Sequence, residues 1–136
     1  MAWCCMSEGI EGNSADWLDR ANEDLRVAGL LLPHGVFNTV AYHCQLAAEM
    51  AIKAALVAHG AMPKKTHDLA LLLAQAQACG ARFDADLGQA CRVLTPLEAV
   101  SRYPGWGQVA QAQAIAAHEL AQLVVAVVCR SVARAG

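Results

Sequence analysis

The stretch TVAYHCQLAAEMAIKAALVAHG, residues 39–60, decides the fold of this chain. Alanine and other apolar residues fill nearly all of it, and alanine has the highest intrinsic helix propensity of any residue. Gly60 follows at its end, and glycine is the residue that most often terminates a helix. We therefore expect one long helix over residues 36–59, about 36 Å in length, which is enough to cross a small domain.

A narrow set of polar residues interrupts this apolar helix. At the helical rotation per residue, its members fall within about 60° of one another on the helix surface. The set consists of Asn38, Tyr42, Gln45, Glu49 and Lys53. Two interpretations remain open. The set either meets water, with Glu49 and Lys53 as an ion pair one turn apart, or faces a polar groove in the bundle or across a dimer and binds a ligand there.

The rest of the chain also shows helical patterns, with Ser14 and Thr66 as expected N-caps and Pro96 as an interruption. Asp24 is assigned to the polar face of the first helix. The further helices are expected over residues 14–32, 67–79, 84–101 and 108–135. No segment alternates as a strand does. The predicted fold class is all-α, an antiparallel up-and-down bundle of four to five helices over residues 14–136, preceded by a flexible arm over residues 1–13.

The composition limits the classes of partner. Charged residues make up 16% of the chain, below the roughly 25% that is typical, so we expect a second copy to cover apolar surface in a homodimer. The net charge of −2 and the scattered Lys and Arg residues argue against a broad nucleic-acid surface but leave a small local site open. With no signal-peptide pattern and no apolar run near the ~20 residues of a membrane span, the predicted location is cytoplasmic.

The six cysteines have no metal-ligand spacing. They are Cys4, Cys5, Cys44, Cys79, Cys91 and Cys129, and no CxxC pair occurs among them. We expect small buried apolar side chains in a reducing compartment, with no metal and no cofactor. A metal site is the alternative, without a recognisable ligand pattern to support it.

Four segments together resemble the HEPN domain (higher eukaryotes and prokaryotes nucleotide-binding domain) over residues 14–134. They are WLDRANEDLRVAGLLL (17–32), AYHCQLAAEMAIKAALVAHG (41–60), KKTHDLALLL (64–73) and SRYP (101–104). The resemblance implies a bundle of four or five helices that is usually dimeric. It also implies a minimal nucleotidyltransferase as partner, since family members are commonly encoded beside one, and many act as toxins of toxin–antitoxin pairs.

The catalytic motif of the family is missing from this chain. Active branches are metal-independent ribonucleases in which an Arg is followed, after four to six residues, by a His. No Arg here has a His at that distance; Arg26 and His34 come nearest, with seven residues between them that include Pro33. The resemblance therefore points to a partner-associated branch without the ribonuclease motif. The alternative is a ribonuclease with a diverged catalytic set that uses His67 or His118.

Arg102 and Tyr103 form the first candidate ligand site, in a Pro- and Gly-rich loop before the last helix. The guanidinium is suited to bind a phosphate or carboxylate with two hydrogen bonds, while the phenol stacks or donates. The alternative is structural: Tyr103 packs on the end of the bundle and Arg102 caps the preceding helix.

His67 and Asp68 open the helix over residues 67–79, where Asp68 favours the positive end of the helix dipole. Because residues 60–66 return the chain towards the long helix, both are also candidates to meet Glu49 and Lys53 in one cleft. His43 is expected to be a hydrogen-bonded residue at a helix contact. No catalytic residue is identified. The predicted ligand-binding set is Tyr42, Gln45, Glu49, Lys53, His67, Asp68, Arg102 and Tyr103.

Overall fold

The computed structural model describes residues 12–135, so the expected arm over residues 1–13 lies almost entirely outside the described part. Every regular element within residues 12–135 is helical, and no strand occurs there. The elements are α2 (Ser14–Leu31), η1 (Leu32–His34), α3 (Phe37–Ala58), α4 (Leu69–Ala78), α5 (Ala85–Leu94), α6 (Leu97–Arg102), η2 (Pro104–Trp106) and α7 (Gln111–Ala135). The predicted all-α bundle is confirmed.

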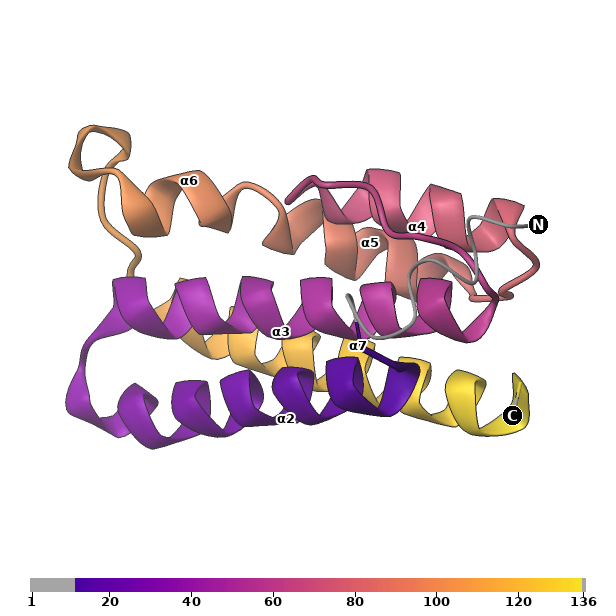
Figure 1. Cartoon of the computed structure of the whole chain (residues 1–136). Helices are drawn as coiled ribbons and strands as arrows, with labels where there is room; N and C mark the ends of the chain where they lie inside the picture. The colour runs from indigo at the N-terminus through magenta and orange to yellow at the C-terminus, as the bar shows by residue number, and fades with distance from the viewer. Residues whose placement is uncertain (1–11, 136) are drawn as a thin grey trace.

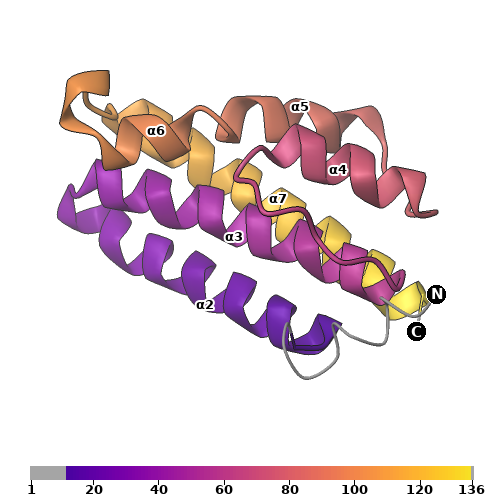
Figure 2. The same cartoon turned by 45° about the horizontal axis from the view of Figure 1, so that its top comes forward.

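Helix α3 is the central element of the bundle. The long helices α2, α3 and α7 run side by side, and the shorter α4, α5 and α6 form a second row across them (Figures 1 and 2). Helix α3 packs against α2, α7, α4 and α6. Its alanines make this possible, since Ala41, Ala48 and Ala55 are at most 1% exposed and a methyl group lets neighbouring backbones come close.

The N-caps of α2 and α4 are not the residues that the sequence predicts. The N-cap of α2 is Asn13 instead of Ser14: its Oδ1 accepts from the backbone N–H of Asp16 at 2.9 Å, and Asp16 Oδ2 accepts from Asn13 N–H at 3.0 Å. This reciprocal capping box satisfies two free donors at once. The N-cap of α4 is Asp68 instead of Thr66, because the Thr66 hydroxyl accepts from Asp68 N–H and forms the turn before the helix.

The helix ends follow the expected chemistry. Gly60 has a φ of +75°, and the N–H of Ala61 donates to the carbonyl of Leu56 at 2.9 Å, which is a Schellman end. Pro96 separates α5 from α6, as predicted. Helix α7 begins at Gln111, three residues later than expected, because the N–H of Val109 donates to Asn38 Oδ1 at 2.8 Å and holds this segment against the start of α3.

One described helix, α7 over Gln111–Arg134, is long and apolar enough to cross a membrane by length and composition. In the bundle it packs on α3, α2 and α5, and its residues Ala114, Ala121 and Val128 are fully buried. A core helix satisfies the same length and composition test, and α7 occupies that position.

Candidate functional site

A buried carboxylate on α3 organises the main polar group. Glu49 is 2% exposed, and its Oε2 accepts from Lys53 Nζ at 3.0 Å. Its Oε1 lies 2.8 Å from His67 Nδ1 and accepts from Gln45 Nε2 at 3.3 Å. We name Gln45, Glu49, Lys53 and His67 the Glu49 cluster.

The cluster holds the connection between α3 and α4 in place. Gln45 Nε2 also donates to the backbone carbonyl of His67 at 3.1 Å, so both the main chain and the ring of His67 are bonded to α3. Burial of a carboxylate is costly unless charge and hydrogen bonds compensate it, and the three partners of Glu49 supply that compensation. The His67 side chain itself stays 55% exposed.

Lys53 is enclosed between two partners. Its side chain is 13% exposed, and its Nζ lies 5.8 Å from the ring centroid of Trp17 on α2. A cation at this distance from an aromatic face is attracted to it. Lys53 therefore joins α2 to the Glu49 cluster and, with Glu49 already bonded, is a poor group for binding a ligand phosphate.

A second polar group lies on the same side of α3. The Cζ atom of Arg102 on α6 lies 5.9 Å from the ring centroid of Tyr42, and Arg102 Nη1 donates to Glu98 Oε1 at 2.7 Å. The Glu98 carboxylate raises the pKa of Arg102, which is charged in any case. Tyr42 precedes Glu49 by two helical turns, about 10 Å along the axis.

The other predicted site residues, Asp68 and Tyr103, are not hydrogen-bonded to the Glu49 cluster within the described part of the chain. Asp68 caps α4, with its Oδ1 accepting from Leu71 N–H at 3.2 Å, and no bond to the Glu49 cluster is found within the described residues. Tyr103 is 53% exposed and does not pack on the bundle end. Trp106 in the same turn is 67% exposed, so this loop presents two aromatic rings and Arg102 to solvent.

Sequence reasoning missed the role of Asp24. It is 6% exposed instead of lying on the polar face of α2. Its Oδ1 lies 3.0 Å from His43 Nδ1, while its Oδ2 is buried without a protein partner among the described residues. Desolvation raises the pKa of Asp24, although His43 and Arg20 oppose the shift. A usable signal was its spacing, since Asp24 lies between Ala21 and Ala28 on the core side.

The cysteines within the described part are all free. Burial raises the pKa of Cys44 to about 12 and of Cys91 to about 11, so both thiols stay protonated. Cys79 is exposed at the end of α4, contrary to its expected burial, and Cys129 is half-buried. Cys4 and Cys5 lie outside the described residues. No group of three His, Cys, Asp or Glu side chains suited to a metal ion occurs within residues 12–135.

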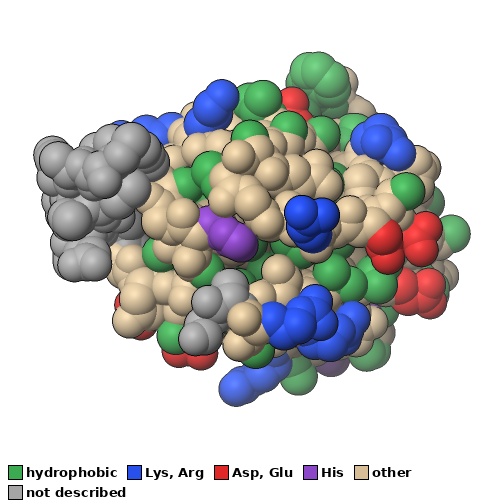
Figure 3. Space-filling view, turned by 90° about the vertical axis from the view of Figure 1, so that its right-hand side faces the viewer, with side chains coloured by type: hydrophobic (Ala, Val, Ile, Leu, Met, Phe, Trp, Pro, Cys, Tyr) green, Lys and Arg blue, Asp and Glu red, His purple; other side chains and the backbone are tan. Residues whose placement is uncertain are grey.

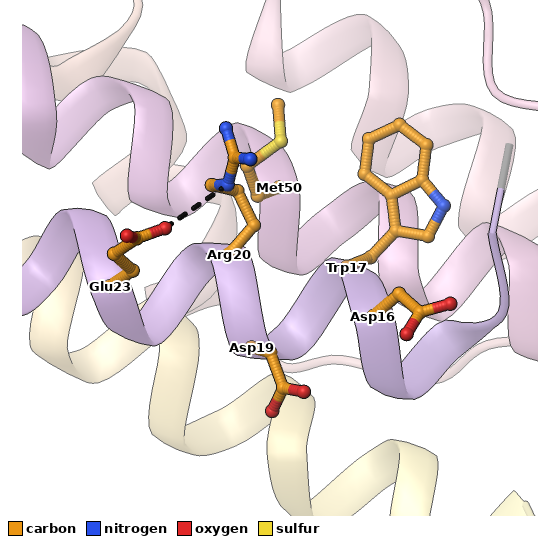
Figure 4. Close-up of a pocket in the computed structure, with 6 residues that line it drawn as sticks. All are labelled: Asp16, Trp17, Asp19, Arg20, Glu23 and Met50. Carbon is orange, nitrogen blue, oxygen red and sulfur yellow. Dashed lines mark ion pairs between the residues drawn. The ribbon is translucent and has the colours of Figure 1, made fainter.

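A surface hollow of about 600 Å³ lies between α2 and α3 (Figure 4). Arg20 points over it and pairs with Glu23 at 3.3 Å. The lining residues are Asp16, Trp17, Asp19, Arg20, Glu23 and Met50. Because Arg20 is already paired with Glu23 and the lining holds two further acidic residues, this hollow is a poor site for a phosphate group, and it contains no residue of the predicted ligand-binding set.

Comparisons with known proteins agree with the geometry. The chain matches no curated protein. Among solved structures, TT1696 from Thermus thermophilus is 29% identical and superposes with a TM-score of 0.79, covering 87% of this chain and 97% of that one. The archaeal HEPN homologue ST0689 is 23% identical with a TM-score of 0.71, covering 88% and 98%, and supports the fold.

The match that decides the family is to the HEPN domain. It extends over residues 14–132, which include every described α-helix in whole or in large part. A structural likeness of this extent and a sequence match over nearly the whole chain identify the same helical module. The chain belongs to the HEPN domain family, whose helical modules have nucleotide- and RNA-related roles.

Proposed function

We propose that this HEPN module binds a nucleotide or phosphate ligand beside α3 and α6, and that it works in complex with a partner protein. The observation that carries the ligand proposal is the position of Arg102, exposed above the ring of Tyr42 on the same side of α3 as the Glu49 cluster. The partner we propose is a minimal nucleotidyltransferase, in a toxin–antitoxin-like pair. The setting we propose is cytoplasmic, with the module as a homodimer of the branch without the ribonuclease motif.

Arg102 is a cation that can exchange its partner for a ligand. Its side chain is 42% exposed and that of Glu98 is 18% exposed, and exposed ion pairs contribute little to stability. A phosphate group offers the guanidinium two parallel hydrogen bonds. The neighbouring rings of Tyr42 and Tyr103 provide faces against which a base can stack.

The distribution of charge favours a small ligand over a long nucleic acid. The ten Lys and Arg residues are scattered along the chain without a basic run, and they are also dispersed on the end of the bundle away from α6 that Figure 3 shows. Affinity for a long polyanion depends on many phosphate contacts at once. A single exposed arginine with adjacent aromatic rings suits one phosphate group and one base.

The test of ligand binding is a thermal-shift titration with AMP, ADP, ATP and inorganic phosphate. A ligand at 100 times its Kd adds about 2.7 kcal/mol of apparent stability, so the wild-type Tm should rise. Arg102→Ala should lose the rise, whereas Arg92→Ala should keep it. Arg92 is the matched control because it is an exposed arginine that hydrogen-bonds to Gln89 on its own helix. No rise with any ligand, or an equal loss in both variants, contradicts this site.

The partner proposal has its own test. Co-expression with a minimal nucleotidyltransferase encoded in the neighbouring gene should give a complex that remains associated during gel filtration. Separate elution of the two proteins at micromolar concentration contradicts the pairing and leaves the ligand proposal unaffected.

A metal-independent ribonuclease is the second candidate, and the contact between Glu49 and His67 is the observation that favours it. A buried carboxylate that holds an exposed imidazole through Nδ1 is an arrangement used for general acid–base catalysis. In the proposed step His67 takes the proton of an RNA 2′-OH, and the 2′-oxygen attacks the adjacent phosphorus to form a 2′,3′-cyclic phosphate. The bond to the 5′-oxygen of the next nucleotide breaks, and that oxygen takes a proton from water.

Incubation of the pure protein with RNA and a metal chelator tests this candidate. Cleavage should be lost in His67→Ala and retained in His34→Ala, which changes another exposed histidine. Intact RNA with the wild-type protein, or equal cleavage by both variants, contradicts the ribonuclease activity and favours the binding module.

A further inference from the structure

A second hollow lies between α4 and α5, two helices of the shorter row that run side by side (Figure 2). Its volume is about 310 Å³, which is at the lower end of the range for small-molecule sites. Most of the residues that line it are apolar, and Leu73, Ala74, Phe83 and Gly88 are among them. Leu73 is 6% exposed and belongs to the core. We name this space the α4–α5 hollow, and its lining contains no residue of the predicted ligand-binding set.

Arg92 supplies the one positive charge among the described residues of the lining. Its Nη1 lies 3.7 Å from the position of a Cβ added at Gly88, so the guanidinium is folded back over α5 beside the hollow. Its Nε and Nη2 donate to Oε1 of Gln89 at 3.2 Å and 2.9 Å, and within residues 12–135 Arg92 has no ion pair. Since a charged acceptor forms a hydrogen bond about twice as strong as a neutral one, a carboxylate can replace the amide oxygen of Gln89.

Gly88 lies in the interior of α5 without a backbone reason. Its φ is not positive, and a glycine inside a helix is less stable than an alanine because it loses more conformational freedom on folding. Apart from its own helix, a Cβ at this position would meet only Arg92 Nη1, at an ordinary contact distance. The fold therefore accepts a larger residue here, and the missing side chain leaves open space beside the guanidinium.

The chemistry of the lining selects the class of ligand. A guanidinium binds a carboxylate or a phosphate group with two parallel hydrogen bonds. One arginine balances the single charge of a carboxylate, whereas a phosphate dianion keeps a net charge beside apolar walls, which is costly. Asp84 also lines the hollow, about 12 Å before Arg92 along the helix axis, and it disfavours a second anionic group there. The apolar walls between the two charges favour a hydrocarbon chain.

We propose that the α4–α5 hollow binds a small aliphatic monocarboxylate, with its carboxylate on Arg92 and its chain over Gly88, against Leu73 and Phe83. The site is additional to the nucleotide site proposed at Arg102 and does not rest on it. A ligand with so few atoms binds weakly, with a Kd on the order of 1 mM. The probe is therefore octanoate, accompanied by hexanoate and decanoate, each added up to about 10 mM.

Isothermal titration calorimetry of the full chain, together with NMR of the backbone amides, tests the site. Octanoate should bind saturably and shift the amide resonances of Ala74, Gly88 and Arg92. Octanamide has the same chain without the charge, octylamine has the opposite charge, and both should bind at least about tenfold more weakly. Arg92→Gln should weaken octanoate binding by a similar factor, whereas Arg26→Gln, at an exposed arginine of α2, should have no effect.

Gly88→Leu should abolish octanoate binding, because the new side chain fills the hollow. Leucine favours a helix more than glycine does, so the Tm of this variant without ligand should not fall; a fall would assign Gly88 to the packing of α5 and overturn its role in the site. The proposal is overturned if none of the three carboxylates binds saturably, if octanamide binds as well as octanoate, or if Arg92→Gln leaves the affinity unchanged. Amide shifts confined to residues outside α4 and α5 place octanoate elsewhere and overturn it too. Nucleotide titrations of the Arg102 variant are separate measurements, so the failure of one site leaves the other standing.

Discussion

Nδ1 of His67 lies 2.8 Å from Oε1 of Glu49, although the two residues are 18 positions apart and belong to different elements. This contact joins the connection before α4 to the middle of α3. The same carboxylate also binds Lys53 and Gln45. A group that is expected to bind a ligand therefore also holds the fold together, and substitutions there must be tested for stability before function.

Replacement of Glu49 by Gln should destabilise the protein. The variant leaves Lys53, whose side chain is 13% exposed, without its carboxylate. Loss of one partner of a buried pair is costly because the other charge stays unpaired. We expect the free energy of unfolding to fall by about 3 kcal/mol, measured by urea denaturation. Glu23→Gln is the matched control, since the Glu23 side chain is 68% exposed and its loss should have little effect. Equal stability of the two variants would show that the Glu49 cluster does not stabilise the fold.

Asp24 should make stability depend on pH in a defined direction. Its pKa in the folded chain is raised above the ordinary 3.8 by desolvation, so the folded state holds a proton that the unfolded state has released. The contribution of Asp24 to stability is therefore present below pH 3.8 and is lost as pH rises through the folded pKa.

Asp24→Asn removes this dependence while keeping the shape of the side chain. We expect the variant to gain stability relative to wild type as pH rises from about 4 to about 7, measured by urea denaturation at each pH. Taking the difference between the two proteins cancels the titration of the groups that lie away from Asp24. A difference that stays constant over this range would refute the raised pKa.

The hydrogen bond from Val109 N–H to Asn38 Oδ1 should stabilise the start of α7. Val109 is 4% exposed, and a buried N–H without an acceptor costs about 1–2 kcal/mol. Asn38→Ala should lower the free energy of unfolding by that amount. Asn22→Ala, which removes an exposed bond to the carbonyl of Leu18 on the same helix, should cost no more than about 0.5 kcal/mol. If the two variants are equally stable, Asn38 does not anchor α7.

The cysteines should differ in their reaction with a thiol reagent such as DTNB. The thiolate is the reactive form, and burial both hides Cys44 and Cys91 and raises their pKa values to about 12 and about 11. We expect Cys79 to react in the native protein at about pH 8, with Cys44 and Cys91 reacting after unfolding in urea. Mass mapping of the modified peptides assigns each site. Modification of Cys44 as fast as that of Cys79 in the native state would contradict the packing of α3.

The sequence predicts the helices well and their first residues less well. Gly60 and Pro96 act locally, through backbone conformation, and their effects appear where they were expected. Asn13 and Thr66 show the limit of this reasoning. Several cap-forming residues stand in a row at each of these helix starts, and small differences in turn geometry decide which of them bonds to the first turn.

The candidate site was also predictable only in part. Tyr42, Gln45, Glu49 and Lys53 share one side of α3 because helical geometry requires it, and this was predictable. The residues that contact these side chains from other elements were not predictable. Arg102 reaches Tyr42 from α6, Trp17 reaches Lys53 from α2, and Asp68 turns to its own helix instead of the expected cleft.

The sequence by itself determined an all-helical chain of the HEPN family, the side of α3 that is polar, and the glycine and proline positions at which helices end. These depend on interactions between residues a few positions apart. The tertiary structure alone decided that Glu49 and Asp24 are buried and that His67 bonds to Glu49. The reason is physical. The burial of a charge and the partner it contacts depend on how helices distant in the sequence pack together, and the periodicity of one helix gives no information on which residues of another helix lie near it.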